Sequence, residues 1–152
     1  GAARLLEKFK LSDPVTAIEI QQFNAYLKQE LTPLFNAIKL HQPVELIGSS
    51  GAFDSVVDVI AGKFNTIGLN DIKTEYQINL THYDFISEMI KKSTLKERYH
   101  ITGLIDMRVD MIVISVLLID FILKEINLDS MRVSTFSLKE GVISKKLGLT
   151  LS

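Results

Sequence analysis

Four small residues, Gly48-Ser49-Ser50-Gly51, have the composition of an anion-binding loop. They follow the apolar segment 43–47, which we expect to be a strand, and they precede a helical pattern from residue 52 to residue 64. A strand that enters a helix through small residues directs several unpaired backbone N–H groups and the positive end of the helix dipole to one point. Gly48 and Gly51 let the backbone approach a ligand, and the hydroxyl groups of Ser49 and Ser50 can donate to phosphate oxygens. These residues therefore indicate a phosphate site, although they also suit a plain turn with a serine cap. No Gly-Lys-Ser/Thr follows, so the loop is not a Walker loop.

Arg108 is the candidate side chain to complete this site. We expect Asp106 to cap a long helix that runs from Met107 to about Ile126, which places Arg108 in its first turn. From there the guanidinium group could bind a phosphate, or it could form an ion pair with Asp110 or Glu88.

Two other charged residues are assigned structural roles. Arg98 is expected to hold the segment before Gly103 by donating to backbone carbonyl groups, because a guanidinium carries five N–H donors. Glu140 lies beside Gly141 at the start of the last predicted helix, where the helix dipole stabilises a carboxylate. A role for Glu140 facing a cleft or a metal is the less favoured interpretation.

The remaining polar residues show no catalytic or metal-ligand spacing. His41, His82 and His100 are far apart, and the chain has no cysteine to join them in a metal site. Asp110 and Asp120 lie on opposite sides of one predicted helix, so they cannot act as a carboxylate pair. We therefore predict no catalytic residue and no metal ligand in this chain.

Strands and helices alternate along the sequence, which favours an α/β fold with a short sheet packed by helices. Segment 2–9 is expected to be a strand or an extended entry, and Ser12-Asp13-Pro14 is expected to start a long helix that kinks or breaks at Pro33, with Thr32 as the second cap. The other expected elements are a loop-rich connection 65–79, a helix capped by Thr81, a shorter helix capped by Ser93 or Thr94 and ending near Tyr99, a strand 131–136, and a last helix from Ser137.

The 152 residues, of which 47% are apolar, are expected to form one domain. Seventeen basic residues oppose eighteen acidic ones, so no long-range field favours nucleic acid or a membrane surface. The most apolar stretch, Met111 to Leu123, is too short to span a bilayer and predicts a buried helix. The absence of cysteine and of a secretion signal at the start favours a cytoplasmic location.

Several separated segments together resemble the exopolyphosphatase and guanosine-pentaphosphate phosphatase (Ppx/GppA) family over nearly the whole chain. Gly1-Ala2-Ala3-Arg4-Leu5 looks like the family segment that enters the second lobe, and residues 48–51 look like its glycine-threonine-serine-glycine loop. The strongest similarity is to the family's run of arginine, glycine-leucine and arginine-alanine-aspartate, which Arg98, Gly103-Leu104, Arg108 and Asp110 resemble here. The last segment comprises Arg132-Val133-Ser134, Leu138, Glu140 and Gly141.

The resemblance implies a ribonuclease-H-like lobe of the actin-like ATPase superfamily. Family members enclose a cleft between two such lobes, use magnesium, and let water attack a terminal phosphoryl group of inorganic polyphosphate or a guanosine polyphosphate. Their first lobe carries an acidic phosphate loop and the catalytic glutamate, and neither sequence occurs here. The chain is therefore expected to be the second lobe, to contribute phosphate contacts from residues 48–51 and Arg108, to bind no magnesium alone, and to be inactive without the first lobe.

Three positions depart from the family pattern. Ala52 stands where threonine usually closes the loop, Thr135 where aspartate is usual, and Lys139 where arginine is usual. Lys139 keeps the charge but cannot form the two parallel hydrogen bonds of a guanidinium group with phosphate. These departures keep open an alternative function, a noncatalytic module that senses phosphate compounds or mediates formation of a homodimer.

Overall fold

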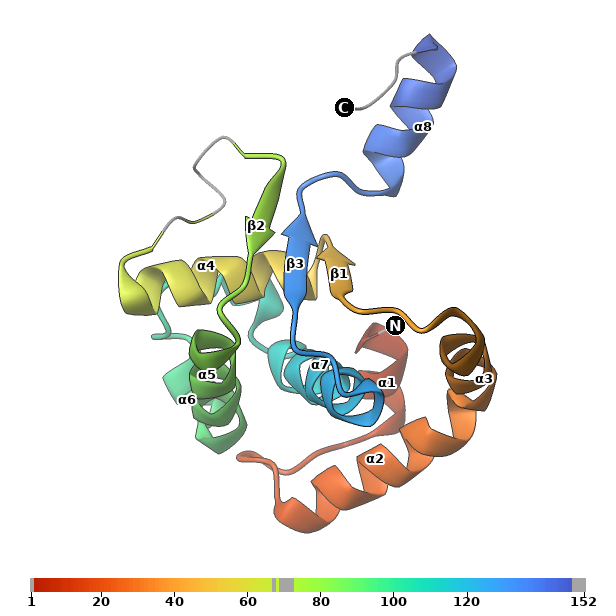
Figure 1. Cartoon of the computed structure of the whole chain (residues 1–152). Helices are drawn as coiled ribbons and strands as arrows, with labels where there is room; N and C mark the ends of the chain where they lie inside the picture. Colours follow the sequence, from red (N-terminus) through yellow and green to blue (C-terminus); the bar gives the residue numbers. More distant parts are fainter. Residues whose placement is uncertain (1, 67, 69–72, 149–152) are drawn as a thin grey trace.

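The computed structural model describes residues 2–66, 68 and 73–148 as helices arranged around a three-stranded sheet (Figure 1). The strands are β1 (Leu46–Ser49), β2 (Glu75–Gln77) and β3 (Met131–Ser134), in the spatial order β1-β3-β2. β1 pairs with β3 in parallel, with Ser49 opposite Ser134, whereas β2 pairs with β3 in the antiparallel direction. The class is therefore α/β with a short mixed sheet, as the sequence predicts.

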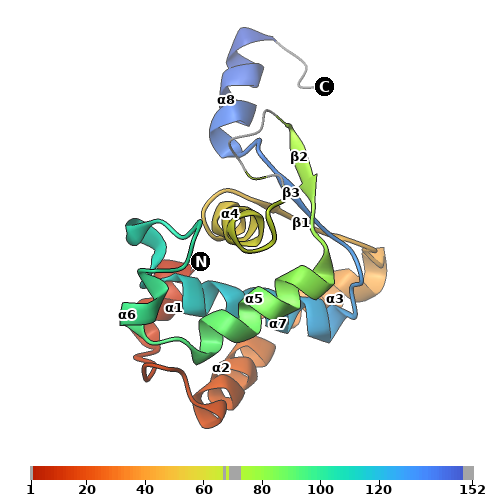
Figure 2. The same cartoon turned by 90° about the vertical axis from the view of Figure 1, so that its left-hand side faces the viewer.

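In the view of Figure 1, most of the described helices lie below the sheet. They are α1 (Ala2–Lys8), α2 (Ala17–Glu30), α3 (Thr32–His41), α4 (Ala52–Phe64), α5 (Leu80–Lys92), α6 (Leu95–Arg98), the 3₁₀ turn η1 (Asp106–Arg108), α7 (Ile112–Ile126) and α8 (Leu138–Leu147). Seen from the side, α4 covers one face of the sheet, and α8 projects away from the rest of the molecule (Figure 2).

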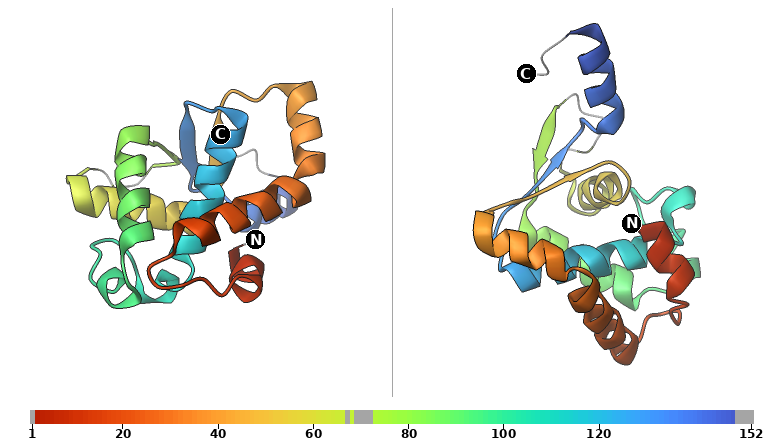
Figure 3. Two further views of the ribbon diagram at one scale, coloured as in Figure 1. Left: turned by 90° about the horizontal axis from the view of Figure 1, so that it is seen from below. Right: turned by 90° about the vertical axis from the view of Figure 1, so that its right-hand side faces the viewer.

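Helix α7 is the centre of the core. Eight of its residues are buried, because α1, α2, α4 and α5 all pack against it. Figure 3 shows α2 crossing α7 when the molecule is viewed from below. The apolar stretch that the sequence predicts as a buried helix is therefore confirmed, and none of the described helices combines the length and apolar character required to cross a bilayer.

The exposed face of the sheet is polar at β3, whereas on β1 the half-exposed Ile47 lies opposite Arg132. Arg132 on β3 forms ion pairs with Glu45 and Glu75, and its two neighbours Met131 and Val133 are fully buried against the helices. This alternation is the usual pattern of a strand with one solvated face.

The N-terminal expectations are wrong in two respects. Residues 2–8 form helix α1, because Leu5 and Leu6 pack onto the core from one side of a helical turn. Helix α2 starts at Ala17, where Thr16 and Glu19 form a capping box. Ser12 only supports this cap, since its N–H and hydroxyl group both donate to Glu19 Oε1 at 2.7 and 2.9 Å.

The long helix breaks before Pro33, which confirms one of the two predicted outcomes. Pro33 lies in the first turn of α3, where its missing N–H is harmless. Thr32 is not the cap: its hydroxyl donates backwards to the carbonyl oxygens of Lys28 (3.2 Å) and Gln29 (2.8 Å), and so satisfies the end of α2.

Three other boundaries differ from expectation. Asn79, rather than Thr81, caps α5 by accepting from the His82 N–H at 3.2 Å. The long helix predicted from Met107 begins only at Ile112, and residues 106–108 form a separate 3₁₀ turn. Strand β2 lies within the predicted loop 65–79, of which residues 67 and 69–72 lie outside the described part. Thr94 caps α6 with Glu97, as expected.

Candidate phosphate site

The loop between β1 and α4 has the geometry that the sequence suggests. β1 extends through Ser49, the backbone then turns at Ser50 (φ 60°) and Gly51 (φ 56°), and α4 begins at Ala52. Gly51 is the N-cap residue, and glycine has no side chain with which to occupy the first amides of the helix. The Phe53 N–H donates to the Ser50 carbonyl and the Gly51 N–H to the Asp54 carboxylate, so the helix dipole and the remaining amide groups are what this helix start can offer to an anion.

Gly48 is required by close packing. A Cβ atom at this position would lie 2.1 Å from the ring of Phe53, so the aromatic ring occupies the space that any side chain would need. Phe53 in turn donates its backbone N–H to the Ser50 carbonyl at 3.2 Å. The ring and this hydrogen bond together fix the turn that joins strand and helix.

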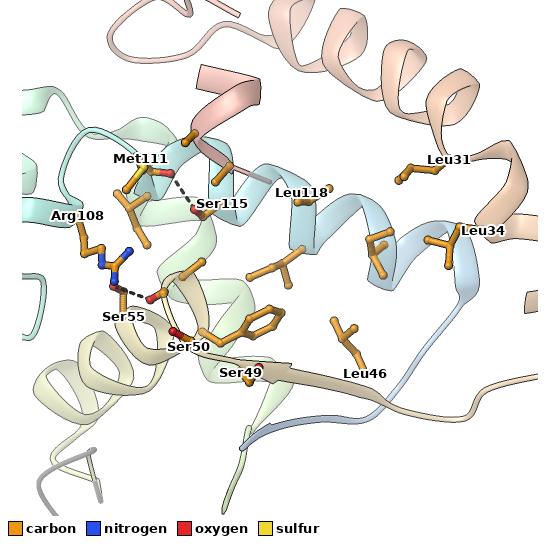
Figure 4. A pocket seen from close by; sticks show the side chains of 18 residues that line it. Leu31, Leu34, Leu46, Ser49, Ser50, Ser55, Arg108, Met111, Ser115 and Leu118 are labelled. Carbon is orange, nitrogen blue, oxygen red and sulfur yellow. Dashed lines mark hydrogen bonds between the residues drawn. The ribbon is translucent and has the colours of Figure 1, made fainter. Parts of the chain in front are cut away.

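Arg108 lies over this turn, as Figure 4 shows. Its Nη1 atom is 3.6 Å from the position that a Cβ atom of Gly51 would take. Among the described residues it forms no ion pair with Asp110 or Glu88, and Glu88 instead pairs with Lys91 and Lys92. The structure thus brings four of the five predicted residues, Ser49, Ser50, Gly51 and Arg108, to one end of a pocket, whereas Gly48 packs against Phe53.

A buried arginine fixes the backbone next to Arg108. Arg98 is 6% exposed, and it donates to the carbonyl oxygens of Ser93 at 2.6 Å and Val109 at 3.3 Å. Its third partner is Asp13, whose carboxylate lies 2.8 Å from Nη2. The predicted type of contact, donation to backbone carbonyl groups, is confirmed, but these carbonyls belong to Ser93 and Val109 and not to the segment directly before Gly103. Through Val109, Arg98 orients the 3₁₀ turn that carries Arg108.

Asp54 is a component of the site that the sequence analysis missed. It lies in the first turn of α4, and its carboxylate accepts a backbone hydrogen bond from Gly51. Burial raises the pKa of Asp54 above its ordinary value, the positive charges of Arg108 and Lys139 oppose this shift, and the negative charge of Asp58 adds to it. The role of Asp54 depends on the charges of Arg108 and Lys139, which lie far from it in the sequence, so no local sequence pattern could have indicated it.

The other family-pattern positions have structural partners. Glu140 accepts hydrogen bonds from the Ser137 N–H and hydroxyl group at 2.8 and 2.6 Å, which lower the pKa of Glu140 to about 2. The favoured interpretation of Glu140 as a helix-start residue therefore agrees with the structure. The Thr135 hydroxyl lies 3.0 Å from the Thr74 carbonyl oxygen and 3.2 Å from that of Lys73, so it links β3 to the chain before β2.

A pocket of about 710 Å³ adjoins the loop, and its walls are mostly apolar. Its polar end consists of residues 49–51, Ser55 and Arg108. Away from that end, Leu31, Leu34, Leu46 and Leu118 line it (Figure 4). The sequence analysis did not predict this pocket, because its walls come from α1, α3, α7 and the β1 edge.

The described residues around the site form no cluster of three metal-ligating side chains. In the described ranges, no three histidine, aspartate or glutamate side chains gather in a way that could hold a metal ion. His82 stacks on Phe64 with ring centroids 3.9 Å apart, and His100 Nδ1 lies 2.9 Å from the Lys96 carbonyl oxygen. These two histidines therefore have structural partners, and the hydroxyl groups of the loop and the guanidinium of Arg108 are groups that suit an anion.

Comparison with known proteins places this geometry in a family. Residues 1–150 match the model of the Ppx/GppA phosphatase family. No curated protein matches the sequence. Among solved structures, an exopolyphosphatase from Cytophaga hutchinsonii is 32% identical with a TM-score of 0.89, and the match covers 99% of this chain and 48% of that one.

Two further structures show the same fold at lower identity. The Ppx/GppA family member of Aquifex aeolicus is 22% identical with a TM-score of 0.72, and the match covers 97% of this chain and 46% of that protein. An exopolyphosphatase-like protein is 16% identical with a TM-score of 0.81, and the match covers 97% and 49% of the two chains. The chain thus spans about half the length of each of these proteins.

Proposed function

Because this chain belongs to the Ppx/GppA phosphatase family, we propose that it forms the phosphate-binding half of a cleft in which a terminal phosphoryl group is hydrolysed. The proposed substrates are inorganic polyphosphate and guanosine pentaphosphate. The observation that carries this proposal is the position of Arg108 over Gly51, at the N-terminus of α4.

The loop and Arg108 are better suited to binding phosphate than to catalysing its hydrolysis alone. Backbone amides and a guanidinium group stabilise negative charge on phosphoryl oxygens, which is most of what phosphoryl transfer requires of a protein. The carboxylate closest to the loop, Asp54, is held by the Gly51 N–H and by the charge of Arg108. We therefore propose that the first lobe, which would correspond to the other half of the relatives' length, supplies the group that activates water.

In this proposal, magnesium reaches the cleft bound to the substrate. A divalent ion bound to the phosphate chain neutralises charge on it. Mg²⁺ is usually held by one or two carboxylates together with substrate phosphates, and the Asp54 carboxylate beside the loop is already engaged by the Gly51 N–H and the charge of Arg108. We propose that the ion is held by the substrate and the first lobe.

The test is phosphate release from polyphosphate, and separately from guanosine pentaphosphate, in the presence of magnesium. The 152-residue chain is compared with its natural sequence extended on both sides to the length of the relatives. We expect release only from the longer protein, and equal rates for the two proteins would contradict the division of roles.

Binding to the chain alone is measured with tripolyphosphate by calorimetry. Arg108→Met should weaken binding by about 10-fold to 100-fold, because hydrogen bonds to a charged group contribute roughly 1.5–3 kcal/mol. Lys96→Met is the matched control, since it removes an exposed positive charge on α6, outside the site. Unchanged binding by Arg108→Met would exclude this residue from the site.

A noncatalytic phosphate-sensing module is the second candidate. One observation favours it: the Thr135 hydroxyl is used to join two strands, at a position where the family usually has an aspartate. Binding of tripolyphosphate without phosphate release by the longer protein would support this candidate.

A further inference from the structure

The carboxylate of Asp54 uses the same groups that the proposed phosphate site offers to an anion. Asp54 is the third residue of α4, and its carboxylate accepts a hydrogen bond from the backbone N–H of Gly51, the residue that precedes the helix. The Arg108 guanidinium lies over Gly51, with Nη1 3.6 Å from the position that a Cβ atom of Gly51 would take, and its positive charge acts on Asp54. A side chain of the protein itself therefore already binds where a phosphoryl group is proposed to bind.

Two other helices begin with an acidic residue in the same position, but they hold it more strongly. In α2 and α8 the third residue is Glu19 or Glu140, and the pKa of each falls to about 2, because the hydroxyl group and the N–H of the cap residue both donate to the carboxylate. These cap residues are Thr16 and Ser137, whose hydroxyl groups lie 2.7 and 2.6 Å from the carboxylate oxygens. The cap of α4 is Gly51, which has no hydroxyl group, so its carboxylate lacks this second donor.

The surroundings of Asp54 disfavour its charge. Burial raises the pKa of Asp54, and the negative charge of Asp58, one turn further along α4, raises it as well. Arg108 on η1, Lys139 on α8 and the Gly51 N–H act in the opposite direction, but the pKa stays above its ordinary value. A raised pKa means that the fold disfavours the ionised carboxylate, in contrast to the carboxylates at the starts of α2 and α8. A phosphoryl group carries more charge and more acceptor oxygens than a carboxylate, so it can replace this weakly held group.

We propose that the Asp54 carboxylate is an internal competitor of phosphate, which takes over the Gly51 N–H and the charge of Arg108 when it binds. Because a carboxylate and a phosphoryl group beside the same N–H repel each other, binding draws a proton onto Asp54. The charge of one residue thereby regulates the affinity of the chain for phosphate, and the affinity rises when Asp54 is neutral. This inference rests on the proposed function, since it concerns the same site.

Substitution of Asp54 tests the competition directly, by calorimetry with tripolyphosphate on the 152-residue chain at pH 7. Asp54→Asn and Asp54→Ser remove the charge and should each strengthen binding by about tenfold or more, because a like charge no longer faces the ligand. Asp54→Glu keeps the charge and should bind no more tightly than the parent. Asp129→Asn is the matched control: this exposed residue precedes β3, at the end of the sheet opposite the loop, and its substitution should change the affinity by less than about twofold.

Thermal stability separates a competitor from an ordinary helix cap. A carboxylate whose folded pKa is raised makes the protein less stable at pH 7 than its neutral form would, so Asp54→Asn should retain or raise the thermal midpoint. Glu140→Gln removes a carboxylate whose folded pKa is lowered, and it should reduce the midpoint at the same pH. A reduction by Asp54→Asn as large as that by Glu140→Gln would assign Asp54 to capping alone and overturn the inference.

Proton uptake gives a readout that does not depend on the size of the affinity change. Calorimetry at about pH 5 in two buffers of different ionisation enthalpy counts the protons that are taken up with tripolyphosphate. The parent should take up more protons than Asp54→Asn, whereas protonation of the ligand and of the histidines contributes equally to both. Equal uptake by the two proteins would show that Asp54 does not respond to the ligand, and it would overturn the inference.

The affinities also distinguish failure of the inference from failure of the proposed function. Unchanged or weaker binding by Asp54→Asn and Asp54→Ser, together with the expected loss in Arg108→Met, would overturn the inference and leave the phosphate site in place. Absence of binding by the parent and by both neutral variants would refute the inference and the proposed function together.

Discussion

Replacement of Arg98 by methionine should destabilise the fold by a predictable amount. The side chain is 7% exposed, and Arg98→Met keeps most of its volume while removing two hydrogen bonds to carbonyl groups and the ion pair with Asp13. Breaking a fully buried pair by removing one partner costs about 3–5 kcal/mol. Asp13 is 40% exposed and keeps its bond from the Leu95 N–H at 2.6 Å, so water can solvate it. We therefore expect a loss of about 2–3 kcal/mol in the free energy of unfolding.

The assay is urea and thermal unfolding followed by far-UV circular dichroism. For a chain of this size, the expected loss lowers the thermal midpoint by about 4–12 °C. Arg98→Lys should lose less than Arg98→Met, because an ammonium group can still donate to one or two of the three partners. A loss below about 0.5 kcal/mol for Arg98→Met would refute the reasoning, since it would show that the buried guanidinium contributes no more than a surface ion pair.

A second readout separates positioning from general stability. Since Arg98 donates to the carbonyl of Val109, the residue after Arg108, folded Arg98→Met should also bind tripolyphosphate more weakly than Arg98→Lys. Measured well below the thermal midpoint of each variant, this difference reports on the 3₁₀ turn. Equal affinities would show that the turn keeps its place without the guanidinium group.

The dependence of stability on pH in the acidic range tests the role of Asp13, the ion-pair partner of Arg98. Burial acts to raise the pKa of Asp13, but the hydrogen bonds from Leu95 and Arg98 and the positive charge of Arg98 together leave it below 3.8. A carboxylate with a lowered folded pKa stabilises the protein above its unfolded pKa and loses this contribution as the pH falls through the folded one. Asp13→Asn should therefore be less stable than the parent at pH 7, and the difference should shrink below pH 3.8.

Four further substitutions test other parts of the fold by urea unfolding. Gly103→Ala should lower the free energy of unfolding by about 2 kcal/mol or more, because the φ of Gly103 is +88° and a Cβ atom would lie 2.1 Å from the Asp58 carbonyl oxygen. Gly141→Ala should instead stabilise α8 by about 0.5–1 kcal/mol, because nothing lies within 4 Å of the added Cβ atom. Equal effects of the two substitutions would contradict both expectations. Glu140→Gln should be less stable than the parent at pH 7, and the difference should vanish as the pH falls from 4.5 to about 2; a constant difference would deny the capping charge a role. Asp120→Asn should cost about 1–3 kcal/mol, because the carboxylate accepts from three donors on α5, and an unchanged midpoint would show that those donors find other partners.

The order of strand, loop and helix in residues 43–64 could be predicted because its signals are local, although β1 occupies residues 46–49 and not the predicted 43–47, so that Gly48 and Ser49 belong to the strand. An apolar run, four small residues and a helical repeat follow one another without a break, and the observed bounds of α4 equal the predicted ones. The end of the chain is similar: Ser137 and Glu140 form a capping box, a pattern visible in four consecutive residues.

Elements that tertiary contacts decide could not be predicted. β2 has three residues, and it is a strand because β3 pairs with it. Asp13 suggests a helix cap by its residue type, yet its carboxylate binds Leu95 and Arg98, more than eighty residues away. Tertiary partners of this kind override local preference, and a single sequence does not reveal them.

The composition of the site follows from one parallel pair of strands. β1 and β3 run in the same direction with Ser49 opposite Ser134, so the loop after β1 and the segment after β3 leave the sheet at the same end. This places Lys139 close enough to influence the Asp54 carboxylate, although 85 residues separate them in the chain. A shift of one residue in this register would turn every side chain of β1 to the other face and move the loop away from Arg108. The packing of Phe53 against Gly48, which forbids a side chain at that strand position, therefore protects the register and the site together.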